Sequence, residues 1–373
     1  MADRVMNFGA GPSALPTSVL EEAAKGLLNF KNTGIGIAEI SHRSKEFAAL
    51  LSDFVLLIRT QLDIPPTHSV LFAQGGGTAQ FSAVVLNLLA RYRLLHPNAS
   101  DDDCVMDYVI TGSWSKKAAE EARRLGGGRV NVAADAREYS KDGKSFDNIP
   151  SDYKFSPDPA LIYYCENETV DGVQFSPDQS SPASFPFHLF PKGTLLPLVG
   201  DHSSSFMSRP IPRLADHAVI YAGAQKNIGP AGLTVLIVRQ DCLVDVDAAA
   251  KLGAAPVPLT MGYKTMADHK SVYNTPPLVS IYISSLVLQR MKDFGGLKYY
   301  EELNKKKADK VYAALEMGEE QGVLRGKVAK DARSSMNIVF DTVGDGTVER
   351  FLAGAEQRSM KCLKGHRQVF SNY

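Results

Sequence analysis

The sequence has little of what marks several classes of protein. Its 373 residues include only four cysteines, at positions 104, 165, 242 and 362, and no C-x-x-C pair. This wide spacing lacks a metal-ligand pattern, and we expect reduced thiols in the core or at the surface. The eight histidines are scattered and no H-E-x-x-H is present, so we expect no metal site in the protein.

An excess of charge and long apolar runs are also lacking. Lys+Arg and Asp+Glu each number 41, so the formal net charge is zero and no nucleic-acid-binding surface is indicated. The first residues, "MADRVMNFGAGPSALP", lack the apolar stretch of a signal peptide, and runs such as "LTVLIV" are too short to span a bilayer. We therefore expect a cytoplasmic protein that binds neither nucleic acid nor membrane.

What the sequence does have is a regular alternation of short apolar runs and helix-like stretches. Hydrophobic residues make up 44% of the chain, enough for a sizeable core, and the length favours two domains. Helices are predicted at 78–92 and 115–126. Uniformly apolar strands between helices indicate an α/β fold with a mostly parallel sheet covered on both faces. The predicted strands are "SVLFAQGGG" (69–77), "DYVITGSW" (107–114), "ALIYYCENET" (160–169), "LLPLVGDHSSS" (195–205), "HAVIYAGAQ" (217–225) and "GLTVLIVR" (232–239).

The pattern of apolar and polar residues changes after about residue 260. The pattern there predicts a smaller α+β domain, and polar stretches at 96–103, 141–159 and 176–194 are predicted to be surface loops. We expect a large domain over 16–262 and a small domain made of 1–15 and 263–373. The elements predicted for the small domain are helices at 282–296, 299–318 and 346–360 and strands at 334–340 and 361–370.

One lysine, Lys226, interrupts the apolar segment "VIYAGAQKNIGPAGLTVLIV" (219–238). Burial lowers the pKa of a lysine and costs stability unless the free amine has a use. Asp201 ends another predicted strand, and ligands of open parallel sheets bind beyond the carboxyl ends of the strands. Taken alone, Asp201 is a turn cap and Lys226 an exposed loop residue. Together they suit pyridoxal phosphate, which needs an amine for its Schiff base and a carboxylate for its ring nitrogen.

The glycine-rich turn "AQGGGTAQF" lies between a predicted strand and a predicted helix. Its N–H groups could hold a phosphate, although a tight turn without a ligand is the simpler interpretation of a glycine triplet. It matches neither the dinucleotide-binding nor the P-loop pattern. Trp114 also follows a predicted strand, where a lone tryptophan is either a core anchor or a surface for stacking on a flat ring.

With these residues in view, the chain resembles the phosphoserine aminotransferases, a class V branch of the fold-type I pyridoxal-phosphate enzymes. The resemblance implies a seven-stranded, mostly parallel sheet in the large domain, pyridoxal phosphate as cofactor and a homodimer. The motifs that carry it are "NFGAGPSALP" (7–16), "EISHRSKEF" (39–47), "CENETVDG" (165–172), "DHSSSFMSRP" (201–210), "YAGAQKNIGPAGLTVLIVR" (221–239), "YNTPP" (273–277) and "LKGHR" (363–367).

The resemblance assigns four residues to the cofactor ring. Lys226 would form the Schiff base and shuttle the proton of the substrate's α-carbon. Asp201 would pair with the pyridine nitrogen, and Trp114 would stack on the ring. Thr169 would hydrogen-bond the ring hydroxyl; otherwise it is a strand-end cap.

The resemblance also assigns residues to the cofactor phosphate. Gly77, Thr78 and Gln225 would hold it from the same chain. Asn274 and Thr275 would reach it from the partner subunit, whereas without the resemblance "YNTPP" is only a turn before a helix. In many family members an arginine follows the glycine triplet, and here Thr78 and Ala79 stand in that stretch.

Two His-Arg pairs resemble the clamp that binds the substrate phosphate, namely His42 with Arg43 and His366 with Arg367. Arginine suits this role because its planar fork binds an anion in bidentate fashion. A lone His-Arg pair is ordinarily a solvated patch. The implied reaction is a ping-pong transamination in serine biosynthesis, in which glutamate becomes 2-oxoglutarate and 3-phosphohydroxypyruvate becomes O-phosphoserine.

The end of the sequence departs from the family pattern. After "KGHR" the family continues with a Gly-Gly-x-Arg-Ala-Ser strand and a last helix, whereas this sequence reads "QVFSNY". That arginine is expected to grip the substrate's α-carboxylate, and losing such a contact costs binding. Our hypothesis is that the ending is abnormal, from an unspliced intron or a frameshift, and leaves apolar surface and a sheet edge exposed.

Two alternatives to the phosphoserine aminotransferase remain open at this point. The first is a catalytically impaired dimer that binds pyridoxal phosphate, which the departure at the end of the sequence would explain. The second is another class V enzyme, such as a serine–glyoxylate or alanine–glyoxylate aminotransferase. The two His-Arg pairs argue against the second, because an unphosphorylated substrate would not need them.

Overall fold

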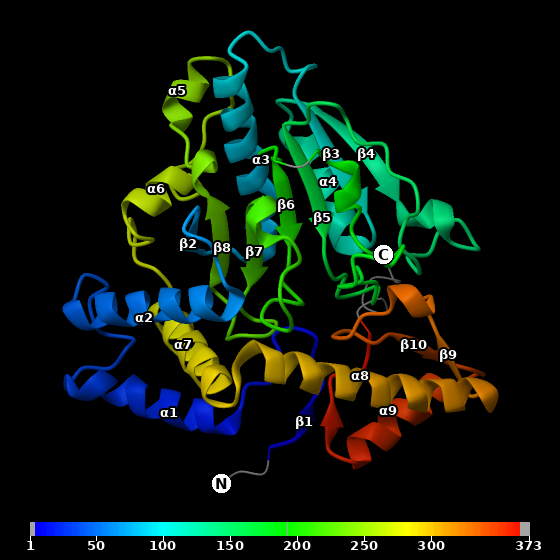
Figure 1. The fold of residues 1–373 in the computed structure, drawn as a ribbon. Helices are drawn as coiled ribbons and strands as arrows, with labels where there is room; N and C mark the ends of the chain where they lie inside the picture. The colour runs from blue at the N-terminus through cyan, green and yellow to red at the C-terminus, as the bar shows by residue number, and fades with distance from the viewer. Residues whose placement is uncertain (1–3, 192, 366–373) are drawn as a thin grey trace.

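The computed structural model describes residues 4–191 and 193–365, and its centre is a seven-stranded sheet flanked by helices (Figure 1). β8 runs antiparallel to both of its neighbours, and the other six strands share one direction. The predicted mostly parallel α/β sheet is therefore confirmed. In spatial order the strands are β2 (His68–Ala73), β8 (Thr234–Arg239), β7 (His217–Gly223), β6 (Leu198–Asp201), β5 (Leu161–Cys165), β3 (Val105–Ile110) and β4 (Arg129–Asp135).

The strands are apolar throughout because both faces of the sheet are covered. Successive side chains of a strand point to opposite faces. In β5, Tyr163 packs on the face covered by α3 and α4, while Ile162 and Tyr164 pack on the other face. The helices are α1 (Thr17–Leu28), α2 (Lys45–Leu62), α3 (Gly76–Leu95), α4 (Ser113–Leu125), α5 (Val246–Ala250), α6 (Tyr263–Asp268), α7 (Leu278–Asp293), α8 (Gly296–Glu320) and α9 (Thr347–Gln357).

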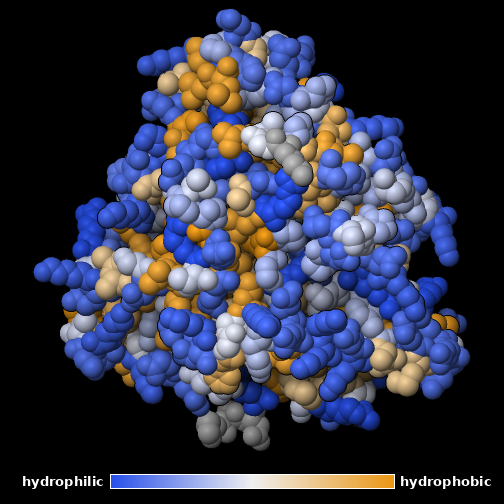
Figure 2. All heavy atoms as spheres, in the orientation of Figure 1, coloured by the Kyte–Doolittle hydropathy of each residue, from blue (hydrophilic) through white to orange (hydrophobic). Residues whose placement is uncertain are grey.

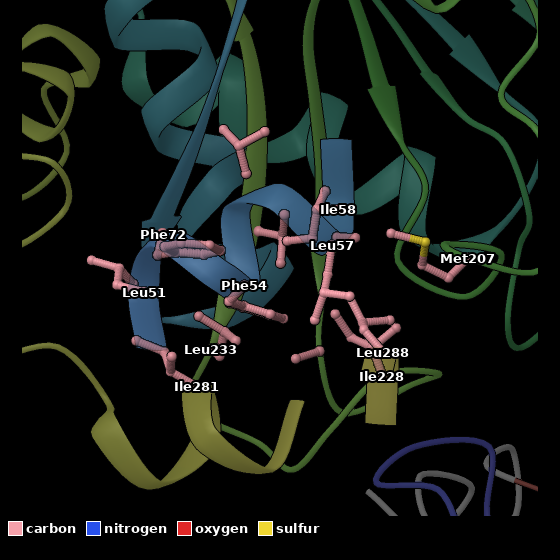
Figure 3. Close-up of a cluster of buried hydrophobic side chains, with 14 of the residues drawn as sticks. Leu51, Phe54, Leu57, Ile58, Phe72, Met207, Ile228, Leu233, Ile281 and Leu288 are labelled. Carbon is pink, nitrogen blue, oxygen red and sulfur yellow. The ribbon is translucent and has the colours of Figure 1, made fainter. Parts of the chain in front are cut away.

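The largest core cluster lies between α2, α7 and the β2–β8–β7 side of the sheet (Figure 3). Phe54 of α2 stacks on Phe72 of β2 with ring centroids 5.0 Å apart, and Ile281 and Leu288 of α7 close the cluster. Burying a side chain of this size stabilises the fold by roughly 1.5–3 kcal/mol. The cluster fixes the two helices against the sheet and thereby fixes the chain that leads to the glycine turn after β2.

The segment after α7 forms shorter elements. β9 (Leu324–Gly326) pairs antiparallel with β10 (Phe340–Thr342), and both lie at the C-terminal end of α8 (Figure 1). β1 (Met6–Asn7) pairs in parallel with β11 (Met360–Lys361), so the beginning of the chain joins this segment. This pairing agrees with the predicted small domain, whose boundaries stay a prediction.

Three sequence-based assignments of secondary structure differ from the structure. The predicted strand 334–340 is mostly loop, because the Ser334 hydroxyl accepts hydrogen bonds from the backbone N–H groups of Met336 (3.0 Å) and Asn337 (2.8 Å). These N–H groups are then not free for a strand partner. The predicted strand 361–370 is limited to β11 within the described residues, and Cys362 leaves the extended region with φ +64°. Strand β4 was not predicted.

Two further observations concern the chain as a whole. All four cysteines are free, and Cys362 alone among them is exposed. Across residues 4–191 and 193–365, no helix combines the length and the apolar character needed to cross a membrane.

Candidate functional site

Lys226 lies in the turn that follows β7, at the carboxyl end of the sheet. Its Nζ donates a hydrogen bond to Thr169 Oγ1 (3.3 Å) and lies 6.0 Å from the centroid of the Trp114 ring. Gly11, at φ +149°, passes so close that a Cβ there would be 2.5 Å from the lysine Cδ. The structure thus brings together three of the predicted site residues, and a glycine makes room for the lysine stem.

The environment of Lys226 changes its acid–base behaviour. Burial lowers the pKa of its amine, and the Asp201 carboxylate partly opposes this shift. An amine with a lowered pKa is a better nucleophile and base near neutral pH than a surface lysine.

Asp201 is the last residue of β6, and its side chain is buried. Oδ1 accepts a hydrogen bond from the Ser203 N–H (2.9 Å), and Oδ2 accepts one from the Tyr221 hydroxyl (3.1 Å). Burial raises the pKa of this carboxyl, while the two hydrogen bonds and Lys226 act in the opposite direction. The site therefore holds a carboxylate that is shielded from water, has fixed partners, and faces a nearby amine.

The glycine turn after β2 brings the start of α3 to the same place. Gly75 and Gly76 have φ of +98° and +65°, which favours glycine at both positions. A Cβ on Gly77 would lie 3.5 Å from Ser203 Oγ and 3.9 Å from Asp201 Oδ2. The first N–H groups of a helix have no partner within it and attract anions. The start of this 20-residue helix is thus placed to hold a phosphate beside Asp201.

Two other predicted phosphate ligands lie at the same end of the sheet. Thr78 is in the first turn of α3. The side chain of Gln225 folds back over the end of β7, since a Cβ on Gly223 would lie 2.6 Å from its Oε1. The Gly223 N–H donates to Ser203 Oγ (3.1 Å), which links this turn to the one after β6.

Trp114 stands at the start of α4, next to a buried carboxylate that the sequence analysis missed. Glu168 accepts hydrogen bonds from the Trp114 N–H (2.9 Å), the Ser115 N–H (2.9 Å) and the Ser115 hydroxyl (2.6 Å). Gly112 leaves space for it, because a Cβ there would be 2.4 Å from Glu168 Cδ. The sequence signal was the acidic residue directly before Thr169 in "ENET". Burial and then Asp171 raise the pKa of Glu168 to about 7.

One polar atom of this group has no partner. The indole Nε1 of Trp114 is buried and makes no hydrogen bond within residues 4–191 and 193–365. An orphaned donor is costly in a folded protein and points to a group that completes the site. An amine, a buried carboxylate, a flat indole and a helix N-terminus at one end of the sheet suit a planar, phosphorylated pyridine aldehyde.

A second group of predicted residues lies next to the glycine turn. The hydroxyl of Thr275 is 3.3 Å from His42 Nδ1, and its carbonyl accepts a hydrogen bond from Gln74 Nε2 (2.8 Å). Asn274 lines an adjacent cavity of about 410 Å³ with Gln74 and Gly75. These hydrogen bonds join Thr275 to His42 and Gln74, and not to Lys226 or Asp201 of the same chain.

The remaining candidates are Arg43, His366 and Arg367. The side chain of Arg43 is exposed. Its backbone N–H donates a hydrogen bond to the hydroxyl of Ser41 (3.2 Å). His366 and Arg367 lie outside the described residues, as does the ending "QVFSNY". The second predicted His-Arg pair is therefore not placed.

The surface around the second group is partly apolar. Tyr273 and Leu259 are 41% and 57% exposed, and both line the cavity beside Asn274. Figure 2 shows that apolar side chains also reach the surface in the middle of the face seen in Figure 1. Apolar surface next to polar site residues is typical of a face that another protein chain covers.

Comparison with known proteins gives a consistent result. Residues 5–367 match the pattern of aminotransferase class V. The phosphoserine aminotransferase of Ectopseudomonas mendocina is 40% identical over 371 residues, which are 99% of this chain and 91% of that protein. A probable phosphoserine aminotransferase of Caenorhabditis elegans is 40% identical over 372 residues, covering 98% and 90%.

A solved structure agrees with these sequence matches. The structure of phosphoserine aminotransferase from Trichomonas vaginalis with bound pyridoxal phosphate superimposes with a TM-score of 0.82 at 33% identity. The match covers 98% of this chain and 93% of that one. The predicted fold-type I architecture is confirmed.

Proposed function

The chain belongs to the phosphoserine aminotransferases of aminotransferase class V, and we propose that it transfers an amino group from glutamate to 3-phosphohydroxypyruvate. The products are 2-oxoglutarate and O-phosphoserine, so the enzyme serves serine biosynthesis. The two half-reactions follow a ping-pong order, with pyridoxal phosphate as the carrier of the amino group.

The observation that carries the proposal is the setting of Lys226. Its amine is largely buried, its pKa is lowered by that burial, and both Trp114 and Thr169 lie near it. When bound, pyridoxal phosphate supplies a ring that accepts the electron pair left as the substrate's α-carbon loses its proton. Lys226 would hold the cofactor through its amine and would carry the α-proton.

The other residues of this group orient the ring. Asp201 holds the proton of the ring nitrogen, which its buried and hydrogen-bonded carboxylate suits. Trp114 would stack on the ring and exclude water, and Thr169 would bind the ring hydroxyl. The start of α3 with Gly77 and Thr78 anchors the phosphate.

We extend the proposal to a homodimer. Gln225 binds the phosphate from the same chain, and Asn274 and Thr275 bind it from the partner subunit. Support comes from the exposed apolar residues Leu259 and Tyr273, which line the cavity beside Asn274. The site is then complete in the dimer only.

The substrate's phosphate requires cations. His42 with Arg43, and His366 with Arg367, supply them in our proposal. His42 Nε2 is buried without a hydrogen-bond partner in the described part of the chain, which leaves it available for an anion. An arginine so exposed as Arg43 is free to form a bidentate contact with a phosphate.

We also propose a division into two domains and a cytoplasmic location. The division into a large domain over 16–262 and a small domain of 1–15 and 263–373 is supported by the pairing of β1 with β11. A cytoplasmic location is supported by the four free cysteines.

The test is a coupled assay of the purified chain with pyridoxal phosphate. We expect turnover of glutamate with 3-phosphohydroxypyruvate, and of O-phosphoserine with 2-oxoglutarate, at least about 100-fold above that of unphosphorylated serine, since losing an ionic contact costs several kcal/mol. Equal turnover of serine and O-phosphoserine would favour another class V aminotransferase. Cofactor binding without turnover would favour the impaired dimer.

A further inference from the structure

Three neighbouring strands place a line of hydroxyl and carboxyl groups beneath the site. Tyr163 of β5, Asp201 of β6 and Tyr221 of β7 belong to the sheet face that α3 covers, and Asp201 is directly opposite Tyr221 in the strand register. The Tyr163 and Tyr221 hydroxyl oxygens are 2.7 Å apart, and the Tyr221 hydroxyl lies 3.1 Å from Asp201 Oδ2. The groups thus form one continuous hydrogen-bonded chain.

The chain of hydrogen bonds has a single direction. A carboxylate only accepts, so the proton of Tyr221 points to Asp201. Tyr163 must then donate its proton to the Tyr221 oxygen. Both tyrosines are fully buried, and burial raises the pKa of each phenol well above its ordinary value, so both remain protonated donors at neutral pH.

Packing holds both rings in place. Tyr163 stacks on Tyr108 with centroids 5.0 Å apart, and Phe81 of α3 meets it edge-on at 6.5 Å. A Cβ on Gly77 would lie 3.6 Å from Tyr221 Cε2, so α3 also confines the second ring. The two hydroxyl oxygens therefore cannot shift without moving the sheet or the helix.

We propose that Tyr163 and Tyr221 are positioning residues, which fix the Asp201 carboxylate in one orientation and keep it negatively charged for the cofactor's ring nitrogen. The proposal rests on the function proposed above. Hydrogen bonds donated to a carboxylate stabilise its ionised form, and successive hydrogen bonds in a buried chain strengthen one another by about 10–30%. The hydroxyl of Tyr163 therefore acts on Asp201 without touching it.

The first test uses the protein without cofactor. The pKa of Asp201 is followed by carbon-13 NMR of labelled aspartate carboxyls, with the Asp201→Asn spectrum identifying the signal. We expect the pKa to rise by about one to two units in Tyr221→Phe, which removes a hydrogen bond to a charged group, and by a few tenths of a unit in Tyr163→Phe.

Tyr108→Phe is the matched control. Tyr108 is as buried as Tyr163 and stacks on it, but its hydroxyl has no hydrogen-bond partner within the described residues. We expect this variant to leave the pKa of Asp201 unchanged. An Asp201 pKa unchanged in Tyr163→Phe and Tyr221→Phe, or raised equally in Tyr108→Phe, would overturn the proposal. If Tyr221→Phe does not fold, the Asp201 pKa in Tyr163→Phe, compared with that in Tyr108→Phe, still tests the proposal.

The second test compares pyridoxal phosphate with an analogue in which a CH group replaces the ring nitrogen. We expect Tyr221→Phe to bind pyridoxal phosphate about tenfold more weakly and to bind the analogue as the unaltered chain does. Equal losses for both compounds would mean that the tyrosines only support packing. If the unaltered chain bound neither compound, the proposed function would fail, and the carbon-13 titration would still decide the role of the tyrosines.

Discussion

The carboxyl end of the large sheet and the segment 324–361 are built in contrasting ways. Strands β5, β6 and β7 are four to seven residues long and buried on both faces. Strands β9, β10 and β11 are two or three residues long, and their side chains are half-buried or exposed. Long buried strands can hold polar side chains in fixed positions away from water, which the short strands cannot.

Charged groups show the same contrast. Asp201 is buried and receives hydrogen bonds from Ser203 and Tyr221, within reach of the Lys226 charge. In the other segment, the ion pair of Arg325 with Asp341 joins side chains that are 71% and 38% exposed. Solvent-exposed pairs contribute about 0–1 kcal/mol. Polar groups at the sheet end are thus buried and fixed for chemistry. Those of the segment 324–361 are exposed and contribute little.

The largest effect should follow from removing the central amine at the sheet end. We expect Lys226→Ala to lower kcat by about 10⁴-fold or more, because the nucleophile and the proton carrier are lost together. Stability should change little, since a buried lysine with a lowered pKa is itself unfavourable to the fold. Steady-state kinetics and circular dichroism measure the two effects.

The matched control is Lys117→Ala. The Nζ of Lys117 lies 4.6 Å from the centroid of the Trp114 ring, so it is another amine near the site. Borohydride reduction followed by mass spectrometry should find the cofactor on Lys226 in the unaltered chain and in Lys117→Ala. Recovery of the label on Lys117 would refute the assignment of Lys226.

The next prediction concerns how much side-chain packing stabilises each of the two regions. Phe54 is fully buried against Phe72, whereas Phe351 is 37% exposed and meets Phe340 edge-on at 5.6 Å. We expect Phe54→Ala to lower the free energy of unfolding by about 3–5 kcal/mol, and Phe351→Ala to lower it by about 1 kcal/mol. Urea unfolding followed by circular dichroism gives both values. Equal losses would contradict the difference in packing between the regions.

The same contrast explains which elements could be predicted. The long apolar strands gave an unambiguous pattern, but the edge strand β4 did not, because its first four residues are exposed or half-buried and its buried end is Ala-Ala-Asp. The segment 334–340 reads as a strand by composition. The hydroxyl of Ser334 takes up two of its backbone N–H groups, and a composition pattern does not contain that information.

For the site, the sequence could place residues at strand ends but not orient them. Lys226, Thr169 and Trp114 were predicted, and the structure brings them together. Tyr163 in β5 and Glu168 in the loop after it were missed, because a buried phenol or carboxylate gains meaning only from the neighbouring strands and helix. The placement of those neighbours depends on packing far along the chain.

Between pH 5 and pH 8 we expect a pH dependence of stability that comes from the sheet end. Burial and Asp171 raise the pKa of Glu168 to about 7 in the folded chain, above the ordinary value of 4.5. The folded state then binds this proton more tightly than the unfolded state. The contribution to stability is complete below about pH 4.5 and is lost as the pH rises through about 7, at about 1.4 kcal/mol per unit. We expect a loss of about 2–3 kcal/mol between pH 5 and pH 8.

Glu316 of α8 provides the matched control from the other region. Hydrogen bonds from Lys330 and then Arg333 lower the pKa of this carboxyl, so its contribution is present above the ordinary carboxyl range and is lost only as the pH falls below it. Glu168→Gln should flatten the fall in unfolding free energy between pH 5 and pH 8, whereas Glu316→Gln should leave the slope unchanged. Urea unfolding of the cofactor-free protein across this range measures both. A slope that survives Glu168→Gln would place the titrating group elsewhere, and the sheet end would then hold Glu168 as a permanently ionised cap for α4.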